Sequence, residues 1–455
     1  MTLKKSFPLS FLTTLLAGLF LSATSHAEWV DLFDGESLDG WEAKNGWAEY
    51  RVEDGAILGK SVPKSPNTFL TTGEVYGDFE LELEVKVDEG LNSGIQFRSL
   101  SFPEYREGRV HGYQYELDTA ERRWTAGIYD EARRGWLYPV DLNPKAKKLY
   151  KQRQWNKVRI ECVGNSIRTW LNGEPVAHLI DDLTSKGFIA LQVHGVGKKT
   201  NIIGKEVAWR NIRINTDIKK PSESKGLYIR NLIPNHVSAN EAAKGWKLLW
   251  NGTNLDGWRN VGKETAPQQG WTIEKGELTI QSTPKGQKKS GGDIVTRKKF
   301  SAFELDFEFK LTPGANSGLK YYIMEPGTSA LGLEYQILDD EKHPDAKMGA
   351  AGNRTCASLY DLIPSKRVVS TRGVPVNVGS WNHGRVVARR NGRIEHWLNG
   401  FKVVSYSRGD NIFRALVARS KFEGKEGFGM VEAGGISLQD HKDKVSYRSI
   451  KIREI

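Results

Sequence analysis

Apolar and polar residues alternate along much of this chain, and the alternation predicts β-strands. Residues 79–87 read Phe-Glu-Leu-Glu-Leu-Glu-Val-Lys-Val, and residues 303–311 read Phe-Glu-Leu-Asp-Phe-Glu-Phe-Lys-Leu. A period of two is expected for a strand with one buried face and one wet face. Because helical periodicity is scarce, we predict an all-β protein built from antiparallel, jelly-roll-type β-sandwiches. Asn172-Gly173 and Asn399-Gly400, each between apolar runs, predict type I′ hairpin turns.

The chain carries the same pattern twice, which predicts two tandem domains. Five groups of residues recur in the same order: residues 29–41, 79–94, 155–156, 171–173 and 191–194 match 246–258, 303–318, 381–382, 398–400 and 438–441. An ordered set of matches is typical of a duplicated domain with loop insertions. We therefore predict a first sandwich over residues 28–216, a linker over 217–243 and a second sandwich over 244–455. Residues 219–226 are polar, whereas residues 228–237 are partly apolar and predict an arm that packs.

The N-terminus predicts export. Lys4 and Lys5 precede an apolar run over residues 11–21, and Ser25-His26-Ala27 resembles a small-residue cleavage site. We expect residues 1–27 to be a signal peptide and the mature protein to be periplasmic, extracellular or bound at the cell surface. No later stretch of sequence is long and apolar enough to predict a membrane span.

Charge and cysteine content narrow the class of function. The formal net charge is +11, but acidic and basic residues are interspersed without a long basic run. We therefore expect no nucleic-acid partner, whereas attraction to anionic polysaccharide stays open. The two cysteines, Cys162 and Cys356, fall in different halves, and we predict two buried thiols rather than a disulfide. Two cysteines cannot form a cysteine-based metal site.

The ordered motifs resemble one known family. They include residues 291–296 (Gly-Gly-Asp-Ile-Val-Thr), 316–318 (Asn-Ser-Gly), 334–339 (Glu-Tyr-Gln-Ile-Leu-Asp), 397–400 (Trp-Leu-Asn-Gly) and 436–441 (Ile-Ser-Leu-Gln-Asp-His). This set resembles the 3-keto-disaccharide hydrolase family, whose fold is the concanavalin A-like lectin/glucanase sandwich. The first half resembles a divergent branch, with residues 110–118 and 127–131 in the equivalent region. The resemblance implies a carbohydrate substrate: a glycoside oxidised to a ketone at carbon 3.

A 3-keto group changes how a glycoside can be cleaved. It acidifies the hydrogen on carbon 2, so a base can form an enolate and the substituent on carbon 1 can leave by elimination. Water then adds back, and the net reaction is hydrolysis. This route needs a base, an acid for the leaving oxygen and a group that stabilises the enolate.

In the second half, Glu334 and Gln336 lie two residues apart on a predicted strand, so both side chains share one face. The resemblance makes Glu334 a candidate general acid or base, whereas a solvated outer face is the alternative interpretation. The further catalytic candidates of this half are Asp339, Lys320 and His441, and its substrate-binding candidates are Gln336, Gln439 and Asp293.

In the first half, Glu116 and Asp118 alternate along a predicted strand with Gln114 on the same face. Two carboxylates there could divide acid and base roles or bind a divalent cation through oxygen. His194 repeats His441, and this recurrence favours a functional imidazole. The substrate-binding candidates of this half are Gln114, Gln192, Arg98, His111 and Trp136.

The sequence leaves several alternatives open. A non-catalytic carbohydrate-binding protein would use the same polar faces, and one domain could cleave while the other only binds. The sequence requires no cofactor, although a divalent cation is compatible with it. A separate sugar 3-oxidoreductase would have to supply the keto substrate. Motifs of serine hydrolases, phosphate-binding loops and zinc-protease helices are missing from the sequence.

Overall fold

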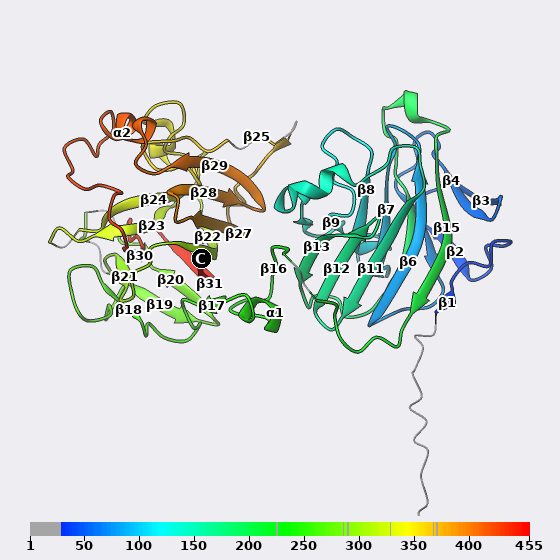
Figure 1. Ribbon diagram of the computed structural model, residues 1–455, viewed down its shortest axis with the longest axis horizontal. Coiled ribbons are helices and arrows are strands. Elements are labelled where there is room, and N and C mark those ends of the chain that lie inside the picture. Colours follow the sequence, from blue (N-terminus) through cyan, green and yellow to red (C-terminus); the bar gives the residue numbers. More distant parts are fainter. Residues whose placement is uncertain are drawn as a thin grey trace, which may run out of the picture.

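The computed structural model describes residues 29–455 except 224–225, 285, 289–290, 328, 367 and 370–371. The described part is predominantly β-structure and forms two antiparallel sandwiches side by side, with the linker between them (Figure 1). The predicted signal peptide, residues 1–27, lies outside the described residues. Within the described ranges, no helix has both the length and the apolar character needed to span a bilayer.

The first sandwich pairs a nine-stranded sheet with a seven-stranded sheet. The larger sheet has the order β16 (Arg230–Asn231), β13 (Glu174–Ile180), β12 (Ser166–Leu171), β11 (Asn156–Val163), β6 (Phe79–Val87), β15 (Glu206–Asn215), β4 (Ala56–Lys60) and β3 (Glu49–Glu53), with β1 (Val30–Asp31) beside β15. The smaller sheet has the order β10 (Gly135–Tyr138), β9 (Ile128–Glu131), β8 (His111–Asp118), β7 (Asn92–Leu100), β14 (Phe188–Val193), β5 (Thr68–Thr72) and β2 (Trp41–Lys44).

The second sandwich repeats this plan with fewer strands. Its larger sheet has the order β19 (Trp271–Glu274), β20 (Glu277–Ile280), β31 (Val445–Glu454), β22 (Phe303–Leu311), β27 (Trp381–Ala388), β28 (Arg393–Leu398) and β29 (Phe401–Ser407), with β17 (Lys247–Leu248) beside β31. Its smaller sheet has the order β18 (Trp258–Asn260), β21 (Ile294–Thr296), β30 (Gly435–Leu438), β23 (Asn316–Met324) and β24 (Leu331–Leu338).

The remaining elements are short. A two-stranded ribbon is formed by β25 (Val368–Val369) and β26 (Arg372–Gly373). The helical segments are α1 (Ala239–Ala242), α2 (Asn411–Val417) and the 3-10 turns η1 (Val140–Leu142), η2 (Pro144–Lys148), η3 (Thr200–Ile202) and η4 (Pro344–Lys347).

The alternating segments behave as predicted in the first copy and differently in the second. In β6 every second residue is buried and its outward neighbours are not. In β22 the outward Glu304 and Asp306 are buried as well. The reason is that linker residue Tyr228 lies on this face, where its hydroxyl donates to Asp306 Oδ2 at 2.6 Å. This part of the outer face is therefore covered, whereas Glu308 and Lys310 farther along β22 are only partly buried.

A buried tyrosine joins the two sheets at the same place in each sandwich. Tyr115 of β8 donates its hydroxyl to the Trp170 carbonyl at 3.1 Å, and Tyr335 of β24 donates to the Trp397 carbonyl at 3.0 Å. In both copies the pairing register of the acceptor strand shifts at that tryptophan. The irregular pairing leaves a carbonyl facing the core, and the tyrosine satisfies it.

Turns and thiols agree with the sequence. Asn172 and Gly173, like Asn399 and Gly400, all have positive φ, as a type I′ turn requires. Cys162 and Cys356 are buried thiols and form no disulfide with each other.

The linker is packed over most of its described length. β16 extends the first domain's larger sheet by pairing in parallel with β13. On the other side, Asn235 exchanges hydrogen bonds with Ser449 of the second domain, and Glu241 binds the buried Lys451 at 2.5 Å. The backbone carbonyl of Tyr228 also accepts a hydrogen bond from the Tyr138 hydroxyl of the first domain at 2.9 Å. The predicted packing of residues 228–237 is confirmed.

Replacing Tyr115 with Phe should lower the free energy of unfolding by about 1–3 kcal/mol, because the Trp170 carbonyl is left buried without a donor. Urea denaturation measures the change. The control is Tyr105→Phe, since the Tyr105 hydroxyl donates to Ala132 in a partly solvated loop and water can replace it. An equal fall in the free energy of unfolding in the two variants would show that the hydrogen bond between the sheets stabilises the protein no more than a bond in a loop.

Candidate active site

Strand β8 presents polar residues on the concave face of the first sandwich. Its apolar residues, Tyr113, Tyr115 and Leu117, are buried against the opposite sheet. Gln114, Glu116 and Asp118 alternate with them and face the other side, as the sequence predicts. A side chain at Gly94 of the adjacent strand would place its Cβ 2.4 Å from Gln114 Cδ, so glycine leaves the space that this row requires.

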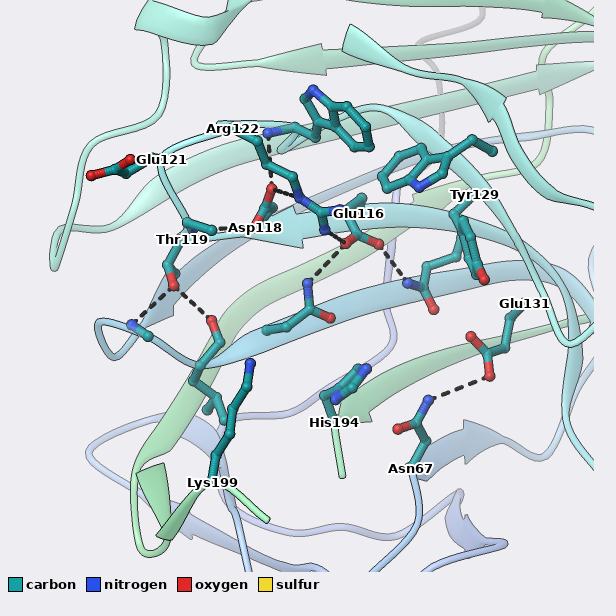
Figure 2. A pocket seen from close by; sticks show the side chains of 17 residues that line it. Asn67, Glu116, Asp118, Thr119, Glu121, Arg122, Tyr129, Glu131, His194 and Lys199 are labelled. Carbon is teal, nitrogen blue, oxygen red and sulfur yellow. Dashed lines mark hydrogen bonds and ion pairs between the residues drawn. The ribbon is translucent and has the colours of Figure 1, made fainter. Parts of the chain in front are cut away.

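A pocket of about 650 Å³ opens on this face (Figure 2). Its size suits a small saccharide. Five of the predicted site residues line it: Gln114, Glu116, Asp118, His194 and Trp136. Among the other lining residues, the sequence did not predict a site role for Asn92, Arg122, Trp124, Tyr129 and Lys199.

Glu116 is buried yet bordered by the pocket. Its Oε1 accepts from Asn92 Nδ2 at 2.8 Å, and its Oε2 accepts from Gln114 Nε2 at 2.8 Å. Burial raises the pKa of the Glu116 carboxyl to about 7, because desolvation outweighs these hydrogen bonds and Asp118 adds a like charge. The group therefore carries a transferable proton near neutral pH.

Arg122 occupies the position between the two carboxylates of β8. Its Nε donates to Asp118 Oδ2 at 2.6 Å, and its Nη2 lies 3.4 Å from Glu116 Oε1. Asp118 also accepts the backbone N–H groups of Ala120 and Trp124. The guanidinium thus fills the place that the sequence offered to a divalent cation, and Asp118 anchors Arg122 and the loop.

His194 lies across the pocket from Arg122 (Figure 2). Its Nδ1 is 2.8 Å from the Gly195 carbonyl, so Nδ1 carries the proton and Nε2 keeps its lone pair. Desolvation lowers the pKa of His194. A neutral imidazole held in one tautomer is suited to remove a proton.

Aromatic rings form one wall of the pocket. Trp124 and Trp136 meet edge to face with centroids 4.6 Å apart, and Tyr129 lies 5.2 Å from Trp136. Phe401 of the second domain packs against Trp124 at 5.5 Å. The wall offers apolar surface on which a sugar ring can stack, and the neighbouring domain supports it from behind.

Gln192 has a supporting position behind the polar row. It is fully buried, and its Nε2 donates to Gln114 Oε1 at 3.1 Å, where Gln96 also donates. The predicted contact of Gln192 with substrate is therefore replaced by a role in orienting Gln114.

Two predicted residues of the first domain lie outside the pocket. Arg98 has φ of 44° at a register shift in β7, and the irregularity turns its side chain away from the concave face. Its guanidinium donates to the carbonyls of Gly77 and Gly164 and to Asp78, which is a structural role. His111 packs against Tyr105 at 3.9 Å between ring centroids, beyond the pocket.

The second domain repeats the polar row with two residues exchanged. In the register of β23 and β24, Lys320 lies opposite Glu334 and Gly318 lies opposite Gln336. In the register of β7 and β8, Gln96 lies opposite Gln114 and Gly94 lies opposite Glu116 in the same way. Glu334 is therefore the counterpart of Gln114, and Gln336 is the counterpart of Glu116. The carboxyl group has moved two residues along the strand, away from the end where His441 lies.

Glu334 is surrounded by charged groups. Burial raises the pKa of its carboxyl, while Lys320 and Lys421 oppose the rise. Lys320 Nζ lies 3.5 Å from Asp293 Oδ2, so two predicted residues form an ion pair beside Glu334. Lys421, which sequence reasoning missed, stacks over Tyr360 at 4.0 Å. It belongs to an insertion between β29 and β30 that has no counterpart in the first copy, so the repeat could not reveal it.

The carboxylate of Asp339 has a different role from the catalytic one predicted. Asp339 accepts the backbone N–H groups of Gly314, Glu341 and Lys342, as Thr119 accepts that of Gly90 in the first copy. Its carboxylate therefore holds the loop together. Gln439, half-buried at the end of β30, uses its backbone N–H to bond the Gly318 carbonyl.

His441 lies beyond Gln439, beside His343 and Asp443 rather than beside Glu334. His343 lies in the loop that follows β24. The structure brings it to His441 because the loops that follow β24 and β30 meet at one end of the sheet.

Comparison with known proteins places these observations in a family. The family model of the 3-keto-α-glucoside-1,2-lyase-like domain matches residues 28–215 and again 245–453. The two matches confirm the predicted duplication and the predicted family resemblance. A 3-keto-disaccharide hydrolase from Bacteroides thetaiotaomicron is 33% identical over 245 residues, which cover 46% of this chain and 79% of the relative.

Two solved structures align with part of this chain. A protein provisionally described as a glycosyl hydrolase, from Parabacteroides distasonis, aligns with 28% identity and a TM-score of 0.43, covering 49% of this chain and 100% of that chain. A carbohydrate-binding module from Bacillus subtilis aligns with 16% identity and a TM-score of 0.28, covering 39% of this chain and 95% of that chain.

The raised pKa of Glu116 makes folding stability depend on pH. The folded group binds its proton up to about pH 7, whereas the unfolded group loses it near 4.5. Its contribution to the free energy of unfolding is fully present below pH 4.5 and is lost as the pH rises to about 7. As the pH rises from 4.5 to about 7, the free energy of unfolding of the native protein should therefore fall relative to that of Glu116→Gln.

Urea denaturation of both proteins from pH 4 to pH 8 measures this difference. Glu121→Gln, at the exposed rim of the same pocket, reports the background change. A stability difference between native protein and Glu116→Gln that stays constant across the range would contradict the raised pKa.

Proposed function

Because the chain belongs to the family of 3-keto-α-glucoside-1,2-lyase-like domains, we propose that it cleaves the glycosidic bond of 3-keto-disaccharides in the pocket of its first domain. One observation carries the proposal: Glu116 and His194 line the same pocket with opposite protonation behaviour. The carboxyl holds its proton to about pH 7, and the imidazole is neutral. Paired groups whose pKa values are set by their surroundings are suited to acid–base catalysis.

The proposed reaction begins with proton removal from carbon 2. His194 Nε2 takes this proton, and the electron pair becomes the enolate of the C3 ketone. The enolate then expels the substituent on carbon 1, whose oxygen takes the Glu116 proton. Water adds to carbon 1 and a proton returns to carbon 2, so the net change is hydrolysis of one glycosidic bond.

Two cations of the pocket suit the enolate. Arg122 lies against Glu116, and Lys199 lines the opposite rim beside His194 (Figure 2). A fixed positive charge near the developing oxyanion lowers the barrier because it needs no reorganisation during the reaction. Cations placed to stabilise an enolate favour a keto sugar as the substrate. An ordinary glycoside would instead be cleaved by two carboxylates on either side of the glycosidic bond.

For the second domain we propose sugar binding as the alternative function. Glu334 lies farther along its strand from His441 than Glu116 lies from His194. Its neighbours Lys320 and Asp293 are paired with each other. Because the Glu334 carboxyl and the His441 imidazole are separated, this domain is better suited to binding sugar hydroxyl groups than to transferring protons at two points of one substrate.

The cellular setting is a further part of the proposal. We propose that the mature protein is exported, as the N-terminal sequence predicts, and works downstream of a sugar 3-oxidoreductase. Such a partner is required because the carbon 2 proton of an unoxidised glycoside is not acidic enough for elimination.

Glu116→Gln and His194→Ala should each lower kcat on a 3-keto-disaccharide by about 10²–10⁴-fold, since each removes one proton-transfer group. Glu334→Gln is the matched control and should keep turnover. Released monosaccharide is quantified by chromatography, with the unoxidised disaccharide as the blank substrate.

The opposite pattern, loss with Glu334→Gln and activity with Glu116→Gln, would move the reaction to the second domain. No turnover by the native protein, combined with measurable sugar binding, would replace the enzymatic proposal with a lectin-like one.

Trp136→Ala should raise KM several-fold with little change in kcat, because a stacked ring is worth about 0.5–1.5 kcal/mol and acts on binding before and during reaction. Trp155→Ala on the outer surface, where Lys86 and Arg210 cover the ring, is the control. A fall in kcat with unchanged KM would instead give Trp136 a part in the chemical step.

A further inference from the structure

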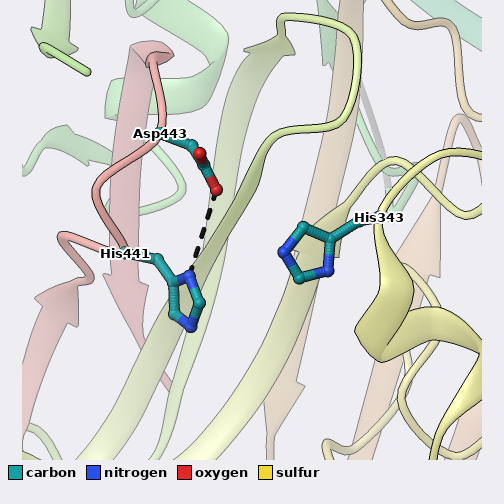
Figure 3. A group of neighbouring side chains, drawn as sticks. All are labelled: His343, His441 and Asp443. Carbon is teal, nitrogen blue, oxygen red and sulfur yellow. Dashed lines mark ion pairs between the residues drawn. The ribbon is translucent and has the colours of Figure 1, made fainter. Parts of the chain in front are cut away.

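Two imidazoles and a carboxylate converge at one end of the second sandwich (Figure 3). His343 follows β24, and His441 and Asp443 lie in the loop between β30 and β31. Their ligand atoms all lie within 4.8 Å of one another. Among the described residues, no other group of three or more His, Cys, Asp or Glu side chains meets this spacing.

Neighbouring groups orient the cluster. Asp443 Oδ2 accepts the Asn316 backbone N–H at 3.0 Å and lies 4.0 Å from His441 Nδ1. The two imidazole rings meet edge to face with centroids 5.9 Å apart. His343 Nδ1 is 3.2 Å from the backbone N–H of Asp345, which fixes the ring at the start of η4.

We propose that His343, His441 and Asp443 bind one divalent first-row transition ion. Imidazole nitrogen and carboxylate oxygen together suit zinc, cobalt, nickel or manganese, whereas calcium prefers six to eight oxygen ligands. Three protein ligands leave coordination positions for water or a sugar hydroxyl. The cluster is only partly buried, so such a ligand can reach it.

Binding through Nε2 of His343 requires the proton on Nδ1, so the contact with the Asp345 N–H must lengthen.

The first domain supplies a natural comparison. His194 occupies the position of His441, but the buried Val196 stands where Asp443 would be. Lys199 also lines the pocket beside His194, and a fixed cation there opposes metal binding. The two copies therefore differ at this position: an acid–base pocket in the first and a metal site in the second.

The experiment titrates the mature protein, purified without a polyhistidine tag, with Zn²⁺ by calorimetry at pH 7.5. Co²⁺ is the second probe, because its visible absorption reports ligand number independently of activity. We expect one equivalent bound at pH 7.5, at least tenfold weaker binding in His343→Ala and in His441→Ala, and unchanged binding in His194→Ala.

Asp443→Asn keeps the shape of the cluster and should also weaken binding, which covers the case of a histidine variant that fails to fold. Unfolding midpoints without metal show whether each variant is folded. Absence of saturable Zn²⁺ binding by the native protein, or equal affinity in folded His441→Ala or Asp443→Asn, would overturn the proposal.

Discussion

A buried tyrosine hydroxyl holds the two sheets of each sandwich in register. Tyr115 and Tyr335 sit in the middle of their strands and donate to carbonyls of the facing sheet. Their immediate neighbours in sequence must then point to the concave side, because side chains alternate along a strand. Gln114 and Glu116 in one copy, and Glu334 and Gln336 in the other, therefore face the ligand side as a consequence of how the core is bonded.

The exchange of carboxyl and amide within this fixed frame separates the two copies chemically. On this face β8 carries one amide and two acids, whereas β24 carries one acid and one amide, with Leu338 where β8 has Asp118. Moving the acid by two residues brings Glu116 nearer to the imidazole end of the sheet and places Glu334 opposite Lys320. A duplicated site can in this way acquire a second chemistry without altering the core.

Much of the fold could be predicted from the sequence, because a period of two, paired Asn-Gly turns and an ordered repeat are local signals. The concave row of β8 followed from alternation alone. Arg98 did not, because an irregularity in β7 reverses the face of its side chain, and no residue pattern marked that position. Arg122, Lys199 and Lys421 lie in loops or insertions, where neither periodicity nor the repeat carries information. The catalytic role predicted for Asp339 was wrong for a related reason. The sequence does not distinguish a carboxylate that contacts a substrate from one that accepts three backbone N–H groups.

The two tandem domains contact each other, and each supports part of the other. Phe401, the first residue of β29, packs behind Trp124, and a Cβ on Gly400 in the turn before it would lie 2.8 Å from Pro139 of the first domain. In return, the linker covers the outer face of the second domain, where Tyr228 bonds Asp306 and stacks with Arg385 at 3.9 Å. Because Trp124 forms part of the aromatic wall, the second domain contributes to the rigidity of the first pocket. Separating the domains would expose Asp306 and Phe401 and loosen that wall, so the interface belongs to the site as much as the strands do.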